Sequence, residues 1–470
     1  MNWKLTKFQI NDNFKFRRNH VLKYLPSALL ANAYKSVSKW RSYKATPLLK
    51  LNKLQRNLDL KNIFYKDESK RFHLKSFKAL GGAYAVEKIS KGKKNITISS
   101  ATAGNHGRSV AWGAKRLKLK CKIFVSQYVS ETRVKEIKKF GAQVIRIKGD
   151  YEDSLKECQK LSKKNNWKIV QDVSTKDYKY IPQLTMAGYS IMIKEISKQT
   201  NQYITHIFLQ AGVGGLAAGV VGGVAKYFKR IPKIIIVEPD QADCVLQSVK
   251  GNRLKKIRIK KESIMGGMSC NEMSLVPWQI LKNASNCCVS ISDKNVAKTI
   301  AGLKDKRFSK NSIIGGECAA PGIIALIGLC NNLKAKKFLN IDKNSNVFLV
   351  SLWHKALKKN NIPTDFVSYL DINREETQKL LKENTHKLDL IIPRGGEGLI
   401  NYIRTNTSIP LLISGRGNNF VYIHDKCDFD MAIDIVLNGK SRLSVCNAID
   451  KVLINKSLPN FAQKVETLVN

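Results

Sequence analysis

Short runs of apolar, mostly β-branched residues alternate with amphipathic segments between about residue 45 and residue 351. Four of the runs, NITISS, CKIFVS, AQVIRI and HIFLQA, are each followed by residues with helical spacing, and KIIIVEP and NVFLVS complete the series. Buried apolar strands that alternate with helices are typical of a parallel sheet in the α/β class. In such sheets ligands bind where the carboxyl ends of the strands lead into helices. The pattern therefore predicts an α/β fold with its site at these junctions.

The α/β pattern restarts near residue 354 and continues to residue 470. Helical segments are interspersed there with the runs DFVSYLD, LDLIIPRGGEG, IPLLIS, NFVYIHD and CNAIDKVLI. No Pro-, Gly- or Ser-rich linker separates the two regions. We therefore predict three parts: an N-terminal extension over 1–44, a main domain over 45–351 and a shorter, truncated α/β domain over 354–470.

Composition narrows the class of protein only a little. The 470 residues are 43% hydrophobic and 25% charged, which is ordinary for a soluble globular protein. Lysine and arginine number 82 against 36 acidic residues, which gives a net charge of +46. Such a charge is typical of nucleic-acid or membrane-surface binding, but here the basic residues are dispersed and no basic stripe is interleaved with aromatic residues. We expect no specific nucleic-acid partner, only salt-sensitive affinity for polyanions.

The sequence also disfavours a membrane span and a metal site. The apolar run 207–228 is long enough to cross a membrane, but it contains many glycines and fits a strand, turn and helix. The first twenty residues lack the apolar core of a signal peptide. Ten cysteines occur without a C-x-x-C pair, so no zinc or thioredoxin-like site is predicted. Reduced thiols in the cytoplasm are then the default.

Lys78 lies in the stretch SFKALGGAYA, just before a helical run. A lysine that forms a Schiff base must lose its proton readily, and burial among apolar side chains lowers the pKa of a lysine. The apolar neighbours of Lys78 would provide such surroundings, and Gly81-Gly82 would let the backbone approach a flat ligand. For this motif alone, the alternative is a surface lysine that precedes a helix.

Two further motifs place small residues between a strand and a helix. In SSATAGNHG, N–H groups at the helix N-terminus would suit a carboxylate, and Asn105 could present its amide to a ring hydroxyl; a simple cap by Thr102 or Asn105 is the alternative. In FLQAGVGGLAAG, successive N–H groups would cradle a phosphate. The same loop spells the looser G-x-G-x-x-A of a dinucleotide site, with Glu238 at the end of the next strand. The accompanying motifs favour a single phosphate over a nucleotide.

In their order along the chain, these motifs resemble those of the diaminopropionate ammonia-lyases. These are pyridoxal-phosphate enzymes of the fold type II group, which includes tryptophan synthase β. The resemblance covers about residues 40–351 and extends to QD with YIPQLTMAGY, to IIIVEPDQADC and to MGGMSCNEMSLVPWQIL. It implies a fold of two α/β lobes, pyridoxal 5′-phosphate as cofactor, a small amino acid as substrate and a homodimeric, cytoplasmic enzyme.

The resemblance also implies roles for individual residues. Lys78 would carry the cofactor through a Schiff base, and Asp172 would be a second catalytic residue in the active site. The cofactor would be held further by Asn105, Gly212, Val213, Gly214, Gly215 and Ser351, of which Ser351 would face the pyridine nitrogen. The α-proton and the β-amino group of 2,3-diaminopropionate would leave, and the resulting aminoacrylate would hydrolyse to pyruvate and ammonia.

Two departures from the family bear on function. The family's T-D-G-N-H loop has an aspartate that serves as the base for the D-isomer, and Ala103 stands at that position. We therefore expect activity to narrow to the L-isomer, with Lys78 as its base. After Ser351 the family continues with an acidic, polar turn, which LWHKALKKNN replaces, so one side of the pocket would be incomplete. A serine or threonine dehydratase and a non-catalytic, decayed fusion are the alternatives.

Smaller candidates near the site carry alternatives of their own. Cys244 and Cys270 could pair in a disulfide, although free thiols are expected in the cytoplasm. Asp240 and Asp243 could face the substrate or cap a helix equally well. His106 is expected to be structural rather than catalytic.

The region from about 354 to 470 is similar to an internal slice of γ-glutamyl phosphate reductase (glutamate-5-semialdehyde dehydrogenase), which has the aldehyde dehydrogenase fold. Cys446, in SVCNA, is the candidate for that family's nucleophilic cysteine, and an unused thiol is the favoured alternative. The family's E-T-G-x-G-N-C-H motif is degraded to ISGRGNNF. Ile413, Asn419 and Phe420 replace its glutamate, cysteine and histidine. We therefore expect no residual reductase activity.

Overall fold

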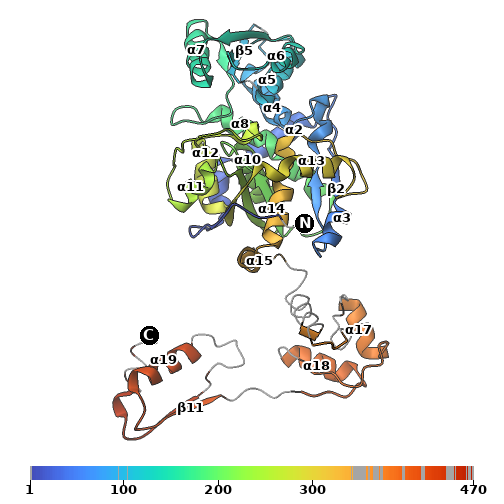
Figure 1. Cartoon of the computed structure of the whole chain (residues 1–470), viewed down its shortest axis with the longest axis vertical. Coiled ribbons are helices and arrows are strands. Elements are labelled where there is room, and N and C mark those ends of the chain that lie inside the picture. The colour runs from blue at the N-terminus through green and yellow to red at the C-terminus, as the bar shows by residue number, and fades with distance from the viewer. Residues whose placement is uncertain are drawn as a thin grey trace. The chain divides into compact units, whose positions relative to one another are not determined.

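The computed structural model divides the chain into two compact units, Met1–Ala356 and Leu357–Asn470 (Figure 1). In the first unit it describes residues 3–93, 95–102, 104–339, 341 and 356. In the second it describes residues 357, 360–363, 370, 374–393, 397–413, 419–440, 449, 451–461, 463 and 467. Ala103, Ser351 and Cys446 lie outside the described residues.

The first lobe of the first unit is built on a four-stranded parallel sheet of order β6-β5-β4-β7. Its strands are β4 (Thr97–Ala101), β5 (Lys120–Ser126), β6 (Gln143–Ile147) and β7 (Lys168–Ile169). Its helices are α4 (Lys78–Ser90), α5 (Asn105–Arg116), α6 (Glu131–Lys138) and α7 (Tyr151–Lys164). The central strands bury residues on both faces, such as the consecutive Ile123 and Phe124 of β5, because helices cover a parallel sheet on both sides. The runs NITISS, CKIFVS and AQVIRI are thus confirmed as parallel strands.

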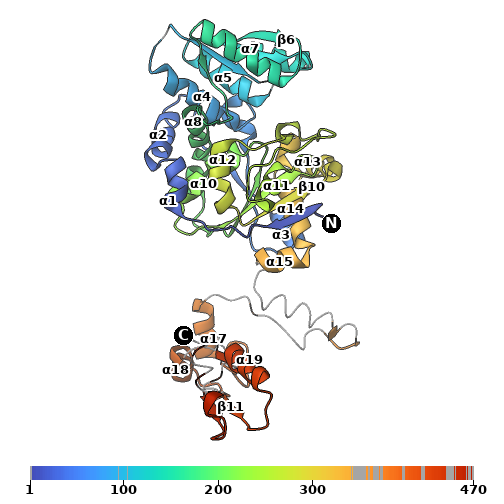
Figure 2. The same ribbon diagram turned by 90° about the vertical axis from the view of Figure 1, so that its left-hand side faces the viewer.

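The second lobe is built on a four-stranded sheet of order β1-β10-β9-β8. Strands β8 (His206–Gln210), β9 (Lys233–Pro239) and β10 (Cys287–Ile291) are parallel, and β1 (Lys7–Ile10) pairs with β10 in the antiparallel sense. The helices that follow the first lobe or flank this sheet are α1 (Arg18–Tyr24), α2 (Ser27–Val37), α3 (Asn52–Asn57), α8 (Tyr180–Tyr189), α9 (Ile191–Gln199), α10 (Gly215–Tyr227), α11 (Cys244–Lys250), α12 (Leu275–Ala284), α13 (Val296–Lys304), α14 (Pro321–Cys330) and α15 (Leu333–Leu339). The two-lobed α/β architecture predicted for this part of the chain is confirmed (Figures 1 and 2).

Residues of the expected N-terminal extension form part of this unit. Helices α1 and α2 bury Val21, Leu25, Leu30 and Val37 in its larger hydrophobic core. Spacings of four residues (Val21 to Leu25) and seven residues (Leu30 to Val37) place the apolar side chains on one face of each helix. The run 207–228 forms β8, a turn and α10. Across the part of the chain that the structure describes, no helix is long and apolar enough to cross a membrane.

Several short elements complete the first unit. Strands β2 (Leu48–Lys50) and β3 (Phe64–Lys66) form an antiparallel pair. The 3-10 helices are η1 (Glu68–His73), η2 (Gly266–Met268), η3 (Asp293–Asn295) and η4 (Glu317–Ala319). Of these, η1 leads directly toward α4 and therefore toward Lys78.

The second unit has a small α/β structure of its own. Helices α17 (Arg374–Glu383), α18 (Glu397–Asn406) and α19 (Phe429–Lys440) accompany two parallel strands, β11 (Phe420–Ile423) and β12 (Lys451–Ile454). One face of this strand pair packs with α19 in a small core around Ile423, Val436 and Phe461. The runs NFVYIHD and CNAIDKVLI thus contain the strands that they predict.

Candidate active site

A large cavity lies between the two lobes of the first unit, with a volume of about 2540 Å³. Residues that follow β4 in the first lobe and β8 in the second lobe both line it, including Asn105 and the loop Gly212–Gly215. The carboxyl ends of parallel strands therefore face this space, as is usual for α/β ligand sites. Lys78 and Asp172 also line the cavity.

Lys78 and Asp172 form an ion pair inside the cavity. The distance from Lys78 Nζ to Asp172 Oδ2 is 2.7 Å, and the side chains are only 27% and 19% exposed. Burial alone would lower the pKa of the Lys78 amine, but Asp172 outweighs burial and raises it above its usual value. Likewise, His106 and Lys78 overcome the burial of Asp172 and hold the pKa of its carboxyl below the usual range. The expectation that an apolar pocket would lower the pKa of Lys78 is wrong for the cofactor-free protein.

The position of Lys78 follows from a close crossing of α4 and α8. A Cβ on Gly81 would lie 2.5 Å from the Tyr189 ring, and a Cβ on Gly188 would lie 2.1 Å from the carbonyl oxygen of Leu80. Only glycine leaves room for such an approach of two helices. Gly81 therefore serves helix packing, a role that the sequence did not indicate. The crossing brings the Tyr189 ring beside Lys78, whose Nζ lies 5.9 Å from the ring centroid.

His106 supports the other side of the ion pair. Its Nε2 donates to the carbonyl oxygen of Val170 at 3.0 Å, and its Nδ1 lies 3.7 Å from Asp172 Oδ2. Burial lowers the pKa of the His106 imidazole, so the ring is neutral near pH 7 and uses its single proton in the bond to Val170. His106 thus fixes the backbone that carries Asp172, in agreement with the structural role expected for it.

The loop that carries Asp172 is tied to the glycine loop across the cavity. The Ser174 N–H donates to Ser274 Oγ at 2.7 Å, and the Ser274 N–H donates to the carbonyl oxygen of Val213 at 3.0 Å. Sequence reasoning assigned no role to either serine or to Tyr189. Ser274 and Tyr189 lie within stretches that carried the family resemblance, whereas Ser174 does not, and only the fold shows that Ser174 and Ser274 meet.

The turn between β8 and α10 has the geometry of an anion cradle. Gly214 has a left-handed backbone with φ +90°, and α10 begins at Gly215. A Cβ on Gly212 would lie 2.9 Å from Cys270 Sγ and 3.1 Å from the carbonyl oxygen of Gly267. By contrast, a Cβ on Gly215 would meet open space. Backbone N–H groups at such a turn, next to a helix N-terminus, favour a phosphate.

Substitutions at two neighbouring glycines should separate folding from phosphate binding. Gly214→Ala should lower the free energy of unfolding by about 1–3 kcal/mol, because its φ is unfavourable for alanine and its Cβ would lie 2.9 Å from Pro277 Cβ. Gly215→Ala should change that free energy by less than about 0.5 kcal/mol but weaken pyridoxal phosphate binding about tenfold. Urea unfolding and cofactor titration measure the two effects. Unchanged cofactor affinity in Gly215→Ala would place the phosphate elsewhere.

Asn105 lies at the start of α5 and is exposed to the cavity. Its side-chain oxygen accepts a hydrogen bond from Arg108 Nη1 at 3.2 Å. Gly104 is the N-cap residue of α5, and no side chain caps that helix, so the simple cap by Thr102 or Asn105 is wrong. Asn105 itself lies on the cavity wall, where the sequence analysis expects it.

The remaining acidic candidates from the sequence make structural contacts, and the two cysteine candidates form no disulfide. Glu238 is fully buried and accepts hydrogen bonds from the N–H groups of Val245 and Leu246, and burial raises its pKa to about 8. The Glu238 carboxylate therefore does not reach the cavity, where it would have to bind the ribose of a dinucleotide. Asp243 lies at the N-cap position of α11, but its side chain makes no capping hydrogen bond there and pairs with Lys7 at 2.7 Å. Asp240 Oδ2 accepts a hydrogen bond from Thr6 Oγ1 at 3.2 Å. Cys244 and Cys270 are free thiols.

Comparison with known proteins identifies the family. The sequence pattern of the family described as "Pyridoxal-phosphate dependent enzyme" matches residues 40–341. The chain belongs to this family. It is 33% identical to the diaminopropionate ammonia-lyase of Salmonella typhimurium over 343 residues, which cover 66% of this chain and 85% of that protein. The resemblance found from the motifs is thus confirmed.

Solved structures agree with this family assignment. The crystal structure of Escherichia coli diaminopropionate ammonia lyase with an aminoacrylate-PLP azomethine intermediate is 30% identical, with a TM-score of 0.66, over 73% of this chain and 92% of that chain. Threonine deaminase isoform 2 from Solanum lycopersicum is 21% identical, with a TM-score of 0.60, over 70% of this chain and 90% of that chain. The latter shows the shared fold alone.

The second unit has different relatives. A stretch of 127 residues is 42% identical to γ-glutamyl phosphate reductase of Anoxybacillus flavithermus. It covers 27% of this chain and 30% of that protein. The resemblance to a reductase slice is confirmed, and the chain spans less than a third of the reductases that it matches.

The residues at the cavity fit pyridoxal phosphate. Lys78 supplies a primary amine, and the loop before α10 supplies the anion cradle. Two buried polar atoms beside the ion pair, Tyr189 Oη and His106 Nδ1, have no hydrogen-bond partner among the described residues. Such atoms are unusual in native proteins and are typical of a site that completes its contacts with a ligand.

Proposed function

We propose that the chain is a pyridoxal-phosphate dependent ammonia-lyase that converts 2,3-diaminopropionate and water into pyruvate and two molecules of ammonia. The observation that carries this proposal is the Lys78–Asp172 pair, which lies in the same cavity as a glycine-rich anion cradle. The similarity to diaminopropionate ammonia-lyases over most of their length supports the substrate.

The proposed site consists of residues from several elements of both lobes. Lys78 would hold the cofactor covalently, and Asn105 would contact its ring oxygen. The phosphate would be bound by the loop Gly212–Gly215, which includes Val213. Ser351 would face the pyridine nitrogen, on the strength of the family resemblance. When bound, pyridoxal phosphate delocalises the electron pair left on the substrate α-carbon.

The chain's own residues would manage the protons. The substrate amine would displace Lys78 from the cofactor as a free amine, and Lys78 Nζ would then accept the α-proton of the L-isomer. Asp172 Oδ2, at 2.7 Å in the cofactor-free protein, would orient this amine and stabilise its protonated form. The departing β-amino group needs a proton, which the same pair can return.

Substrate preference tests the proposal and its alternative. We expect pyruvate release from L-2,3-diaminopropionate and at least about 100-fold less from the D-isomer, because Ala103 has no side-chain base. Pyruvate release from L-serine should be weaker. A chain that prefers serine would be a dehydratase instead. Ala103→Asp is the matched variant, and it should raise turnover of the D-isomer without changing that of the L-isomer.

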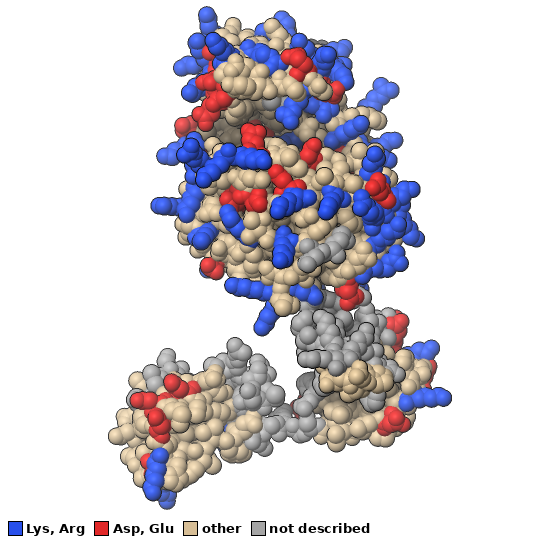
Figure 3. Space-filling view, viewed as in Figure 1, with Lys and Arg blue, Asp and Glu red and all other residues tan. Residues whose placement is uncertain are grey.

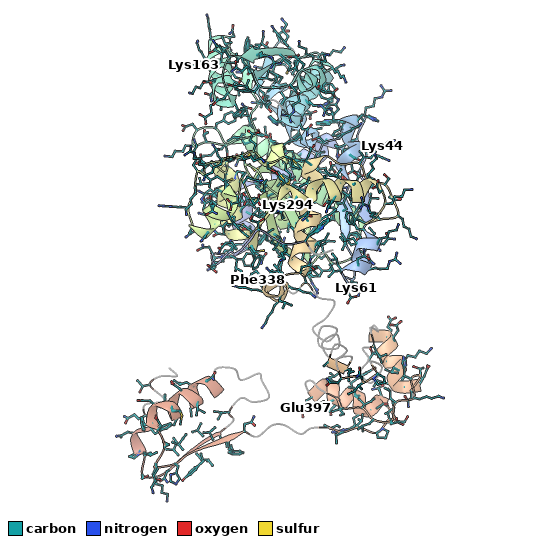
Figure 4. All side chains as sticks on the ribbon, in the orientation of Figure 1. Lys44, Lys61, Lys163, Lys294, Phe338 and Glu397 are labelled. Carbon is teal, nitrogen blue, oxygen red and sulfur yellow. The ribbon has the colours of Figure 1, made fainter. Side chains whose placement is uncertain are left out.

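Assembly and location belong to the same proposal. We expect a homodimeric, cytoplasmic enzyme, with a lyase domain over 45–351 and a partial reductase-like domain over 354–470. Lys and Arg are spread over the visible face of the first unit (Figure 3). The labelled Lys44, Lys61, Lys163 and Lys294 lie well apart on it (Figure 4). This dispersion supports the absence of a specific nucleic-acid partner from the proposed function.

A further inference from the structure

A buried ion cluster lies just upstream of Lys78. Arg71 is 1% exposed, and its guanidinium binds Glu195 of α9 through two hydrogen bonds of 2.8 Å and Glu68 through two more of 2.8 Å. Lys66 Nζ lies 2.6 Å from Glu195 Oε2. The formal charges of these four residues sum to zero, which is the condition for keeping ions inside a protein.

The guanidinium of Arg71 uses its full set of donors. Besides the two carboxylates, it donates to the carbonyl oxygen of Lys44 at 3.1 Å and to Thr46 Oγ1 at 3.0 Å. No other side chain offers five donors in one plane. Arg71 therefore joins three separate parts of the chain: the segment before β2, the 3-10 helix η1, and α9.

The segment that follows Arg71 adopts an unfavourable backbone conformation. Phe72, His73 and Lys75 have φ of 49°, 58° and 54°, a region in which non-glycine residues are uncommon. Side chains in this stretch alternate between buried Phe72, Leu74 and Ser76 and exposed His73 and Lys75. Such a conformation persists only where surrounding contacts impose it.

Contacts on both sides impose the conformation. The Phe72 ring stacks on Trp112 of α5, with centroids 4.9 Å apart, while Arg71 is held by Glu195 of α9. At the other end of the stretch, Ser76 Oγ accepts from the Lys78 N–H at 3.2 Å, and Ser109 Oγ donates to the Lys78 carbonyl at 2.7 Å. Lys78 thus begins α4 at a point that the strained turn and its anchors define.

We propose that Arg71 is a positioning residue for Lys78. By fixing the start of the strained turn, its guanidinium sets where α4 begins and thereby holds the Lys78 amine against Asp172. This inference rests on the proposed function only in taking Lys78 as the cofactor-binding amine. Arg71 itself lies in the protein interior and takes no part in the chemistry.

The test compares Arg71 variants with a partly buried arginine that anchors a part of the fold away from Lys78. Arg71→Met/Glu195→Gln keeps the cluster neutral, and Arg71→Lys keeps the charge but not the planar donors. The control is Arg18→Met, because Arg18 donates to the carbonyl oxygens of Ala225, Phe228 and Lys229 at the end of α10. Each full-length variant is measured for Tm, for pyridoxal phosphate Kd, for visible circular dichroism of the bound cofactor, and for borohydride labelling of Lys78 by peptide mapping.

The double variant should weaken cofactor binding at least about tenfold, reduce the labelling of Lys78 and change the visible circular dichroism. Arg71→Lys should show a smaller loss of the same kind, and Arg18→Met should lower Tm alone. A cofactor Kd within about twofold of the unmodified protein in the double variant, or in Arg71→Lys if the double variant does not fold, overturns the inference.

The readouts distinguish this inference from the proposed function. Labelling of Lys78 requires no substrate, so an unmodified protein that labels at Lys78 but releases no pyruvate contradicts the lyase proposal and still allows the Arg71 comparison. An unmodified protein that does not label at Lys78 overturns both.

Discussion

Lys78→Ala should abolish both covalent cofactor binding and pyruvate release. The loss of turnover should be at least about 10³-fold, as is usual when the residue that forms the covalent bond is removed. Lys78 is the lysine that pairs with Asp172 in the cavity, and no neighbouring amine has that partner among the described residues. Borohydride reduction with peptide mapping, together with pyruvate release, measures the two effects.

Lys88→Ala provides the matched control. Lys88 lies in the last turn of the same helix, α4, about 15 Å along the axis from Lys78. The Lys88→Ala variant should keep both borohydride labelling of Lys78 and pyruvate release. Pyruvate release by Lys78→Ala at a rate near that of the unmodified protein would exclude Lys78 as the reactive amine. Labelling of another cavity lysine in the unmodified protein would identify that lysine as the reactive amine in place of Lys78.

The strands and the glycine loop could be predicted from the sequence because their signals are local. A run such as KIIIVEP is buried on both faces of a parallel sheet, and β-branched residues favour that environment. We did not predict strand β10, because its run CCVSI begins with two cysteines rather than β-branched residues, although every residue of it is buried. Strand β1 was missed because its partner, β10, is some 280 positions away, and its own four residues carry little signal.

The electrostatics of the site could not be predicted in the same way. The sequence shows that Lys78 has apolar neighbours, and this alone implies a lowered pKa. The carboxylate that reverses the direction is 94 positions away and reaches Lys78 only in the folded chain. The same limit applies to Gly81, whose need for glycine at the crossing of α4 with α8 appears only in the fold. Residues that act through tertiary contacts need the fold before their roles can be assigned.

The second unit covers only part of the reductase sequence, and its motif differs from that of its relatives. Phe420, Tyr422 and Leu453 on β11 and β12 are each at least half exposed, while alternate residues pack with α19. A strand pair normally buries such side chains against another layer. With 30% of the reductase length present and Asn419 in place of the motif cysteine, we assign the proposed activity to the first unit alone.

Asp172→Asn should reduce pyruvate release by about 10²–10³-fold, because the amide cannot stabilise a protonated Lys78 amine or hold a proton. The substitution also removes the charge that raises the pKa of Lys78, so burial should then hold this pKa below its usual value. Asp177→Asn is the matched control, since Asp177 is exposed in the same loop. Equal turnover in both variants would exclude Asp172 from proton transfer.

The same substitution should change how stability depends on pH in the cofactor-free protein. The folded pKa of Asp172 is depressed, so its contribution is present above the unfolded pKa of about 3.9 and is lost as pH falls. The folded pKa of Lys78 is raised, so its contribution is present below about 10.4 and is lost as pH rises through the folded value. Asp172→Asn should therefore cost about 1–3 kcal/mol between these limits, with a smaller cost below about pH 4. Urea unfolding at several pH values tests this, and a cost that stays constant through pH 4 would show that the ion pair does not form in solution.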